Sequence, residues 1–562
     1  MNTKLSYTFI ITAIVVVTVF SGCSKDFLNT KIDTYETPST IATDRATLFE
    51  FANATYVDIP NGFSALDNNF FAAASDDGQQ TAKFSTNALL FNQGGLNPNS
   101  INIAAGEGFY KKMYDGIRSC NFFLNYSKNA DALLSLNRDT VSDSVNYHRD
   151  ELFIGWYRAE AHILRAFYYA QLIKRYGGVP LITNTLQQSD SLAVQRATYD
   201  QVVSFIVSEI DKYADSLQTD WATSNYSDQE GRFTKGAALA LKSRVLLYAA
   251  SPLHNLGNDV TKWQQAAAAA YAVIQLNQYS LDPNYGNYFT GNNALSSPET
   301  IFAVRMPASN DPEKENYPIS TPGGSSGVCP TQNLVSAYEF IGTPDPSNPY
   351  ANRDPRLAAT VVVNGRNWNG RTIDEAPGGT DDMSLPNTSR TGYYLKKFLT
   401  DNLNLVQGGT ASHTWIVFRY AEILLNYAEA MNEAYGPDNS NGYALTARQA
   451  LEMVRNRASN SLSQVTATSQ SEFRQAVHHE RRVELAFEGF RYWDLLRWKE
   501  ADAVLNQPVQ GVSVTLNSNG STFNYQVVNV ASRVFTPAMY YFPFSHSEII
   551  NSHGAIVQNP GY

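Results

Sequence analysis

The densest group of residues that could do chemistry lies between Glu480 and Lys499. Glu480, Glu484 and Glu488 are spaced i, i+4 and i+8, so they share one face of a helix. Two carboxylates held together can act as general acid and base. The same stretch also carries four arginines, Arg481, Arg482, Arg491 and Arg497. Because arginine partners keep carboxylates ionised, we interpret the cluster as a structural ion-pair network rather than as a catalytic pair.

Other catalytic signatures are missing from the sequence. We find no nucleophile elbow, P-loop or dinucleotide fingerprint. The glycine-rich stretch 323–327 lacks the neighbouring helix and lysine of a phosphate cradle, and His478-His479-Glu480 is not a zinc-binding HExxH motif. We therefore predict a protein that is not an enzyme, with no catalytic residue, no metal site and no cofactor.

The net charge and the N-terminal segment further limit the class of protein to which this chain can belong. The formal net charge of −10 argues against nucleic-acid binding, which depends on Lys and Arg neutralising phosphates. Phe9–Phe20 is an apolar run behind Lys4, too short to span a bilayer but typical of a secretory signal. Phe20-Ser21-Gly22-Cys23 resembles a lipobox, although Phe20 replaces the usual Leu. This predicts a signal peptide over residues 1–22 and lipidation of Cys23; an ordinary signal peptide that happens to contain a cysteine is the alternative.

The elements that position these residues form two helical blocks. Apolar spacing of i, i+3, i+4 and i+7 over 151–176 predicts an amphipathic helix, which Gly177, Gly178 and Pro180 end. Further helices are predicted at 199–217, 233–250, 261–277, 415–435, 444–458, 471–488 and 489–503. Pairs of helices with small contact residues are typical of tetratricopeptide-like repeats. The fold class is therefore all-α, with large irregular loop and short-strand insertions.

Between the blocks, Gly, Pro, Asn, Asp and Ser dominate and helical periodicity disappears. The predicted organisation is an N-terminal part over 23–280 with a binding insert near 60–105, an irregular ligand-binding insert over 281–412, and C-terminal helix pairs and closing loops over 413–562. No segment after the signal reaches 18 apolar residues, so no transmembrane helix is expected. Irregular insertions on a rigid scaffold are where binding sites usually lie.

Several stretches in the right order resemble proteins of the SusD/RagB family over nearly the whole mature chain. They are RAFYY at 165–169 with YGGVPLI at 176–182, GRFTKGAALAL at 231–241, RYAEILLNYAEA at 419–430, ERRVELAFEGFRYWDLLRW at 480–498 and QNPGY at 558–562. One departure is Phe542-Pro-Phe-Ser, where the family more often has a second proline.

The resemblance implies a surface protein that binds oligo- or polysaccharides and delivers them to a SusC-like TonB-dependent transporter, acting as its lid. It also implies lipid anchoring in the outer membrane of a Gram-negative cell; Ser24-Lys25-Asp26 after Cys23 looks like the surface-export signal of Bacteroidetes lipoproteins. A faint likeness of residues 326–333 to fructan-binding members suggests a fructan as one ligand.

The resemblance also places the ligand where the segment near 60–100 meets those near 285–330 and 365–395. The candidate ligand-binding residues are Asn61, Asp67, Asp76, Asp77, Phe91, Tyr288, Tyr317, Cys329, Trp368, Arg371, Tyr393 and Tyr394. Aromatic planes would cover the apolar face of a sugar, and polar groups would pair with its hydroxyls. Two alternatives stay open: a surface glycoside hydrolase, and a repeat scaffold whose partners are proteins only.

Overall fold

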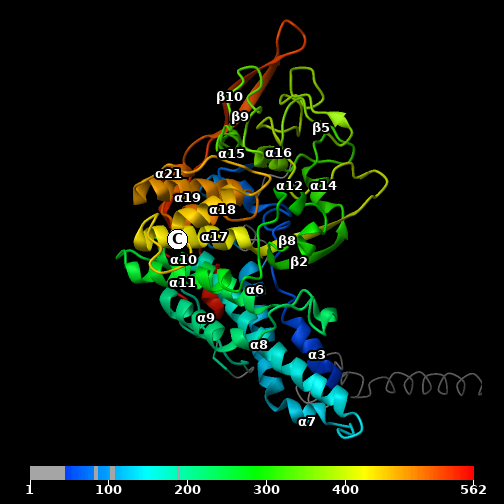
Figure 1. The fold of residues 1–562 in the computed structure, drawn as a ribbon, viewed down its shortest axis with the longest axis vertical. Coiled ribbons are helices and arrows are strands. Elements are labelled where there is room, and N and C mark those ends of the chain that lie inside the picture. The colour runs from blue at the N-terminus through cyan, green and yellow to red at the C-terminus, as the bar shows by residue number, and fades with distance from the viewer. Residues whose placement is uncertain (1–44, 82–86, 102–107, 187–189, 192) are drawn as a thin grey trace, which may run out of the picture.

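The computed structural model describes residues 45–562, apart from 82–86, 102–107, 187–189 and 192. The signal segment and Cys23 thus lie outside the described residues. Helix pairs form the body of the molecule (Figure 1). Its N-terminal helices are α3 Arg45–Ala54, α6 Phe109–Tyr126, α7 Ala130–Leu134, α8 Ser144–Tyr176, α9 Tyr199–Tyr213, α10 Lys235–Ala250 and α11 Val260–Ile274.

Local chemistry sets the ends of these helices. Thr198 caps α9 with a capping box, in which its side chain and that of Gln201 each accept from the other's backbone N–H. Gly177 ends α8 with a φ of 69°, a conformation that favours glycine. Ala-rich faces let α10 pack closely against α11, and α11 against α17. The predicted helices of this block are confirmed, and α8 begins seven residues earlier than its apolar pattern indicates.

Three predictions for the C-terminal block differ from the structure. The helix predicted at 471–488 ends at Glu484, and the one predicted at 489–503 is split into two short helices. The third difference is at 415–435. Residues 415–419 belong to a strand, β8 Ala411–Arg419, and the helix begins only at Tyr420. The apolar run continues from strand into helix, so periodicity hides the boundary; its β-branched and aromatic residues favour the strand. The helices here are α17 Tyr420–Tyr435, α18 Ala447–Arg455, α19 Gln470–Glu484, α20 Arg491–Arg497 and α21 Ala501–Val504.

The insertions carry short elements that join segments far apart in the sequence. The earlier insertion has η2 Phe71–Ala74, β1 Gly78–Gln80 and α4 Asn87–Asn92. The later one has α12 Tyr285–Tyr288, α13 Asn293–Ser296, β2 Thr300–Ser309, α14 Asp311–Asn316, β3 Val328–Pro330, α15 Gln332–Val335, α16 Arg356–Thr360, β4 Val361–Val362, β5 Asn367–Trp368, β6 Arg371–Thr372 and β7 Tyr394–Leu395. Antiparallel pairs β1–β3, β2–β8, β4–β7 and β5–β6 connect them.

The chain closes with a hairpin and short helices, namely β9 Val509–Leu516, β10 Phe523–Ala531, η7 Pro537–Tyr540 and α22 His546–Asn551. In Figure 1 α15, α16 and β5 of the later insertion lie with the β9–β10 hairpin at one end of the molecule, beyond the stacked helices, whereas β2 lies beside those helices. The fold is mostly helical, with 43% helix and only 12% strand, as predicted. Among residues 45–562 that are described, no helix combines the length and apolarity needed to cross a bilayer.

Candidate glycan-binding site

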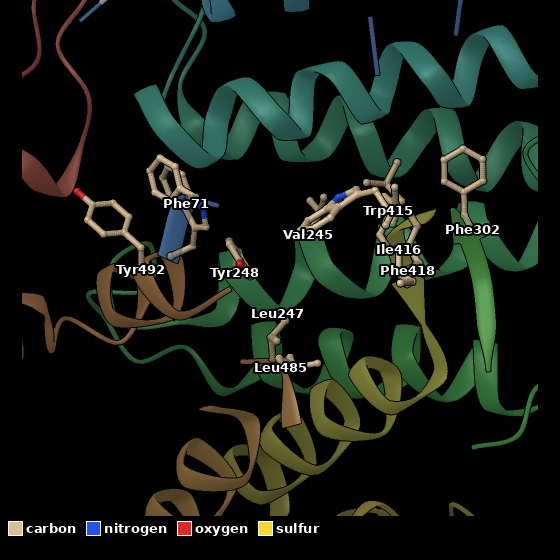
Figure 2. Packing of buried hydrophobic residues seen from close by; sticks show 14 of the residues in the cluster. Phe71, Val245, Leu247, Tyr248, Phe302, Trp415, Ile416, Phe418, Leu485 and Tyr492 are labelled. Atoms are coloured by element: carbon tan, nitrogen blue, oxygen red, sulfur yellow. The ribbon is translucent and has the colours of Figure 1, made fainter. Parts of the chain in front are cut away.

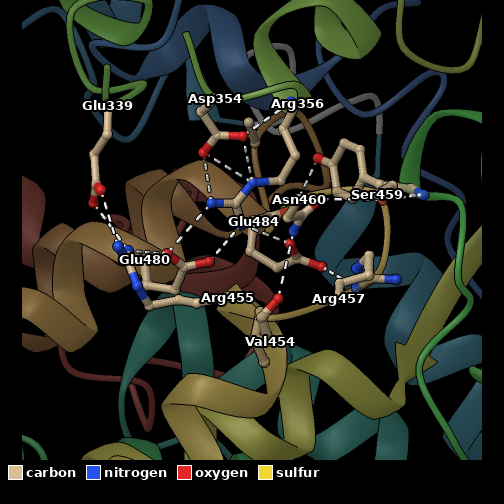
Figure 3. A network of polar contacts seen from close by, with 12 residues as sticks. Glu339, Asp354, Arg356, Val454, Arg455, Arg457, Ser459, Asn460, Glu480 and Glu484 are labelled. Atoms are coloured by element: carbon tan, nitrogen blue, oxygen red, sulfur yellow. Dashed lines mark hydrogen bonds and ion pairs between the residues drawn. The ribbon is translucent and has the colours of Figure 1, made fainter. Parts of the chain in front are cut away.

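The glutamates of α19 and of the turn after it lie in a buried ion-pair network, as predicted, and Figure 3 shows the part around Glu480 and Glu484. The predicted partners are wrong, because the four arginines next to these glutamates in the sequence pair with other carboxylates, namely Asp494, Asp76, Asp77 and Glu429. Arg457 Nη2 lies 2.6 Å and Arg356 Nη1 2.8 Å from the carboxylate oxygens of Glu484. Arg455 Nη1 lies 2.9 Å from Glu480, and Arg419 Nε lies 2.7 Å from Glu488. These side chains are almost completely buried.

The electrostatics of Glu484 does not suit a general acid. Burial alone would raise the pKa of Glu484, but the guanidinium groups of Arg457, Arg419 and Arg356 outweigh it and hold that pKa well below the usual range. A general acid must instead hold a proton near neutral pH. The network therefore has a structural role: through Arg356 of α16 it ties the later insertion to α19.

Asp76 and Asp77 also lie in ion pairs. Arg482 Nη2 and Arg491 Nε each lie 2.8 Å from Asp76, and Arg482 Nε lies 2.8 Å from Asp77. Burial raises the pKa of Asp76, but Arg482 and Arg491 lower it by more, so it stays ionised. The pKa of Asp77 is raised by burial and by the neighbouring charge of Asp76, against the opposing charge of Arg482. These pairs fasten the earlier insertion to α19 and α20.

Six other candidates fill the core of the insertions. Phe91, Tyr288, Tyr317, Cys329, Tyr393 and Tyr394 are each at most 3% exposed. Tyr317 donates its hydroxyl proton to the carbonyl of Thr400, and burial raises the pKa of Cys329 to about 12, so its thiol is unreactive at neutral pH. The three predicted segments do meet, because β1 pairs with β3 and β3 contacts β7. Contact of these six side chains with a ligand stays a prediction.

The remaining four candidates are spread over two places. Asn61 accepts a hydrogen bond from Phe63 N (3.1 Å), and Asp67 accepts one from Ala88 N (2.9 Å), both in the earlier insertion. Arg371 lies 2.7 Å from Asp381, and Trp368 packs edge-on against Tyr317 with ring centroids 6.0 Å apart. Asn61 lines one cavity of the described structure and Trp368 lines another.

Two adjoining cavities follow α16, and we call them together the α16 groove. One, of about 500 Å³, is lined by Trp368 with Tyr350, Arg366 and Lys396. The other, of about 440 Å³, shares Pro355, Ala358 and Lys396 with the first. Its polar lining includes three amides that the sequence reasoning missed, namely Asn284, Asn287 and Asn460. The only available signal was the Asn-rich turn at 283–287.

The α16 groove has the composition of a site for a polar small molecule rather than of a hydrolase. Aromatic rings, amides and cationic donors converge there, and two cavities of this size together accommodate an oligosaccharide. Asp354 is the one carboxylate lining it in the described part of the chain, and Arg356 Nη2 binds it at 2.7 Å. A glycosidase needs two carboxyl groups about 5–10 Å apart across the cleft. The described groove provides no such pair.

Comparison with known proteins identifies the family. A model described as the SusD family matches residues 289–562, and one described as starch-binding and associating with the outer membrane matches residues 26–247. The chain belongs to the SusD/RagB family. SusD-like protein P38 of Formosa agariphila is 27% identical over 373 residues, which cover 64% of this chain and 69% of P38.

Solved SusD-like structures share the whole fold. A SusD-like protein from Bacteroides fragilis superposes with a TM-score of 0.74 at 26% identity, covering 93% of this chain and 98% of that one. A SusD-like carbohydrate-binding protein from the same species gives a TM-score of 0.73 at 23% identity and covers 91% and 99%. SusD/RagB proteins are surface glycan-binding proteins associated with the outer membrane, and they are not catalytic.

Proposed function

We propose that this chain captures an oligosaccharide in the α16 groove at the cell surface and delivers it intact to a SusC-like TonB-dependent transporter. The observation that carries the proposal is the lining of the groove: Trp368, Tyr350 and the amides of the later insertion converge there without a free carboxylate pair. Lipidation of Cys23 would hold the chain on the outer leaflet of the outer membrane, beside the transporter. One solved relative, 23% identical, is described as a laminarin-binding SusD-like protein, so β-glucans join fructans among the ligands to test.

A binding experiment tests the groove. Arg366 is exposed, lines the groove and has no side-chain hydrogen bond among the described residues, so Arg366→Ala should leave the fold intact. After a glycan array has found a ligand, Arg366→Ala should weaken its binding about tenfold, the loss expected for one charge-assisted hydrogen bond. Arg390→Ala is the matched control, because Arg390 is an exposed arginine of the same insertion that lines neither cavity. Equal affinities of the wild type and Arg366→Ala would overturn the placement of the site.

The lid role predicts a stable complex. An outer-membrane lipoprotein has no energy source of its own, so its cargo must pass to an energised barrel. A permanent complex of this kind typically buries about 2,000 Å² or more, and ligand that touches both partners should favour the closed state. Purification through a tag on this chain in mild detergent should therefore recover the transporter. Recovery of the chain alone, from membranes that contain the transporter, would contradict the lid.

A further inference from the structure

A separate cavity of about 330 Å³, here called the cationic pocket, lies where the C-terminal end of α8 meets α10, β8 and the loop before α20. Its walls are largely aromatic and include Phe71, Tyr248, Trp415 and Trp493. Figure 2 shows the first three coming from separate segments of the chain. Ser64 also lines the cavity and is exposed, so the pocket opens to solvent.

Four basic side chains line this pocket, namely Lys112, Lys174, Arg175 and Arg244. Lys174 Nζ lies 4.9 Å from the ring centroid of Trp493, and Arg175 Cζ lies 3.7 Å from that of Phe109. Arg244 Nη2 is paired with Glu422 at 2.6 Å, so its charge is compensated. Lys174 and Arg175 have no carboxylate within ion-pair distance among residues 45–562 that the structure describes. Arg175 donates to the backbone and side-chain oxygens of Gln171, at 3.0 and 3.3 Å.

The one carboxylate that lines the described walls of the pocket is already used. Glu488 receives Lys397 Nζ on one oxygen and Arg419 Nε on the other, each at 2.7 Å. Lys174 and Arg175 therefore face the pocket without a counter-charge from the described residues, and Lys112 adds a further positive charge to its lining. Placed at the C-terminal turn of α8, they interact favourably with the helix dipole, but that effect is small beside the cost of removing an unpaired charge from water.

The electrostatics of the two groups supports the same view. Burial lowers the pKa of Lys174 well below its usual value, and the charges of Arg175 and Arg244 lower it further. Burial also brings the pKa of Arg175 to about 9. Cation–π contact with Trp493 and Phe109 offsets part of this penalty. An anion between the two side chains would offset much more, because a charge-assisted hydrogen bond is about twice as strong as a neutral one.

We propose that the cationic pocket binds an acidic sugar unit, whose carboxylate or sulfate ester lies against Lys174 and Arg175 while its ring packs among the aromatic walls. The volume is at the lower end of the range for small-molecule sites and exceeds what a bare inorganic anion needs. Asn61, Gln171 and Ser64 supply partners for hydroxyl groups. The pocket adjoins the α16 groove: its Trp415 stacks on Phe398, which lines the groove, with centroids 5.5 Å apart. The saccharide part of the inference rests on the proposed function, whereas oxyanion binding does not.

Isothermal titration of the purified full chain with sodium glucuronate, glucose, acetate and sulfate separates the possibilities. Glucuronate should bind about tenfold or more tightly than glucose, since the carboxylate adds a charge-assisted interaction. It should also bind more tightly than acetate or sulfate, since only glucuronate carries a ring. Acetate or sulfate binding as tightly as glucuronate would overturn the saccharide part, and no binding of any anion would overturn the site itself. Loss of neutral-glycan binding in Arg366→Ala concerns the α16 groove and is measured separately.

Substitutions of Lys174 test whether glucuronate binds in the cationic pocket. Lys174→Met keeps the apolar stem and should reduce glucuronate affinity about tenfold while the thermal midpoint of the ligand-free protein holds or rises, because an uncompensated charge has been removed. Lys174→Arg keeps the charge and should retain binding. Lys262→Met is the matched control, because Lys262 pairs with Asp200 on the helix surface outside the pocket. Unchanged glucuronate affinity in Lys174→Met would overturn the proposal, and so would loss of binding in Lys174→Arg with an unchanged thermal midpoint.

Discussion

Glu429 offers the sharpest test of how buried ion pairs stabilise this fold. It lies on α17, and Arg497 donates to both of its oxygens at 2.5 and 2.7 Å, while Trp498 Nε1 donates at 2.8 Å. Burial alone would raise the pKa of Glu429. The charge and the hydrogen bonds of Arg497 outweigh burial and bring the pKa to about 2, against an ordinary value of 4.5.

The size of the effect follows from that difference. The difference between a pKa of about 2 in the folded state and the ordinary 4.5 corresponds, at about 1.36 kcal/mol per pH unit, to about 3 kcal/mol. Because the pKa is lower in the folded state, this contribution is fully present above pH 4.5 and is lost as the pH falls toward 2. Glu429→Gln removes the charge but keeps an acceptor for Arg497, which also retains Asp494 at 2.8 Å. The free energy of unfolding should therefore fall by about 3 kcal/mol at pH 7.

Urea unfolding between pH 7 and pH 2 measures this. The gap between wild type and Glu429→Gln should shrink from about 3 kcal/mol at pH 7 to near zero at pH 2. Taking the difference between the two proteins removes the titration of every other carboxylate. Asp438→Asn is the control: Asp438 pairs with Arg448 at the surface, and its loss should cost less than about 1 kcal/mol. A gap that stays constant from pH 7 to pH 2 would refute the electrostatic account.

Three further predictions concern anchoring, attachment of the insertion and chemistry. Cys23→Ala should move the protein from the membrane fraction to the soluble fraction; continued incorporation of radiolabelled palmitate would contradict lipidation at Cys23. Asp76→Asn should lower the free energy of unfolding by about 3–5 kcal/mol, since it leaves Arg482 and Arg491 facing a neutral amide. An unchanged urea midpoint would show that the ion pairs of Asp76 are not needed for stability. Incubation with any bound oligosaccharide should leave its chain length unchanged by chromatography, and cleavage products abolished by Asp354→Asn would restore the hydrolase alternative.

Local patterns predicted most of the helical body because helix signals are local. The apolar spacing over 151–176 and the Gly-Gly-Val-Pro ending predict the C-terminus of α8 at Tyr176, where the structure has it, whereas its N-terminus lies seven residues before the predicted one. The prediction of a single helix over 415–435 is wrong for a physical reason. An apolar strand leads directly into an apolar helix, and only the pairing of the strand with β2 distinguishes the two. The role of Glu480, Glu484 and Glu488 was predicted, but none of their partners was, because the partners come from distant segments of the chain. Arg356 lies more than 120 residues away from Glu480 in the chain.

The site was harder to predict because burial in an irregular insertion depends on contacts between distant segments. Tyr317 and Tyr394 lie in stretches rich in Gly, Pro and Ser, which suggested exposed loops, yet the insertion has a packed core of its own. Three amides that line the α16 groove, Asn284, Asn287 and Asn460, come from two distant segments of the chain, and only the Asn-rich turn at 283–287 marks any of them in the sequence. Lys174 looked like an ordinary residue near the end of a helix, and only the approach of Trp493 distinguishes it.

The buried network and the α16 groove are parts of one arrangement. Arg356 lines the groove, and its guanidinium group is held by Asp354 and Glu484 at 2.7 and 2.8 Å. The same Glu484 binds Arg419 at the junction of β8 and α17, so the floor of the groove is fixed to the repeat scaffold. A buried ion pair adds little net stability compared with well-packed apolar residues. A site held rigid before binding, however, loses less conformational entropy when a ligand arrives. The network is therefore best explained as the device that keeps an otherwise irregular insertion in one conformation, ready to bind.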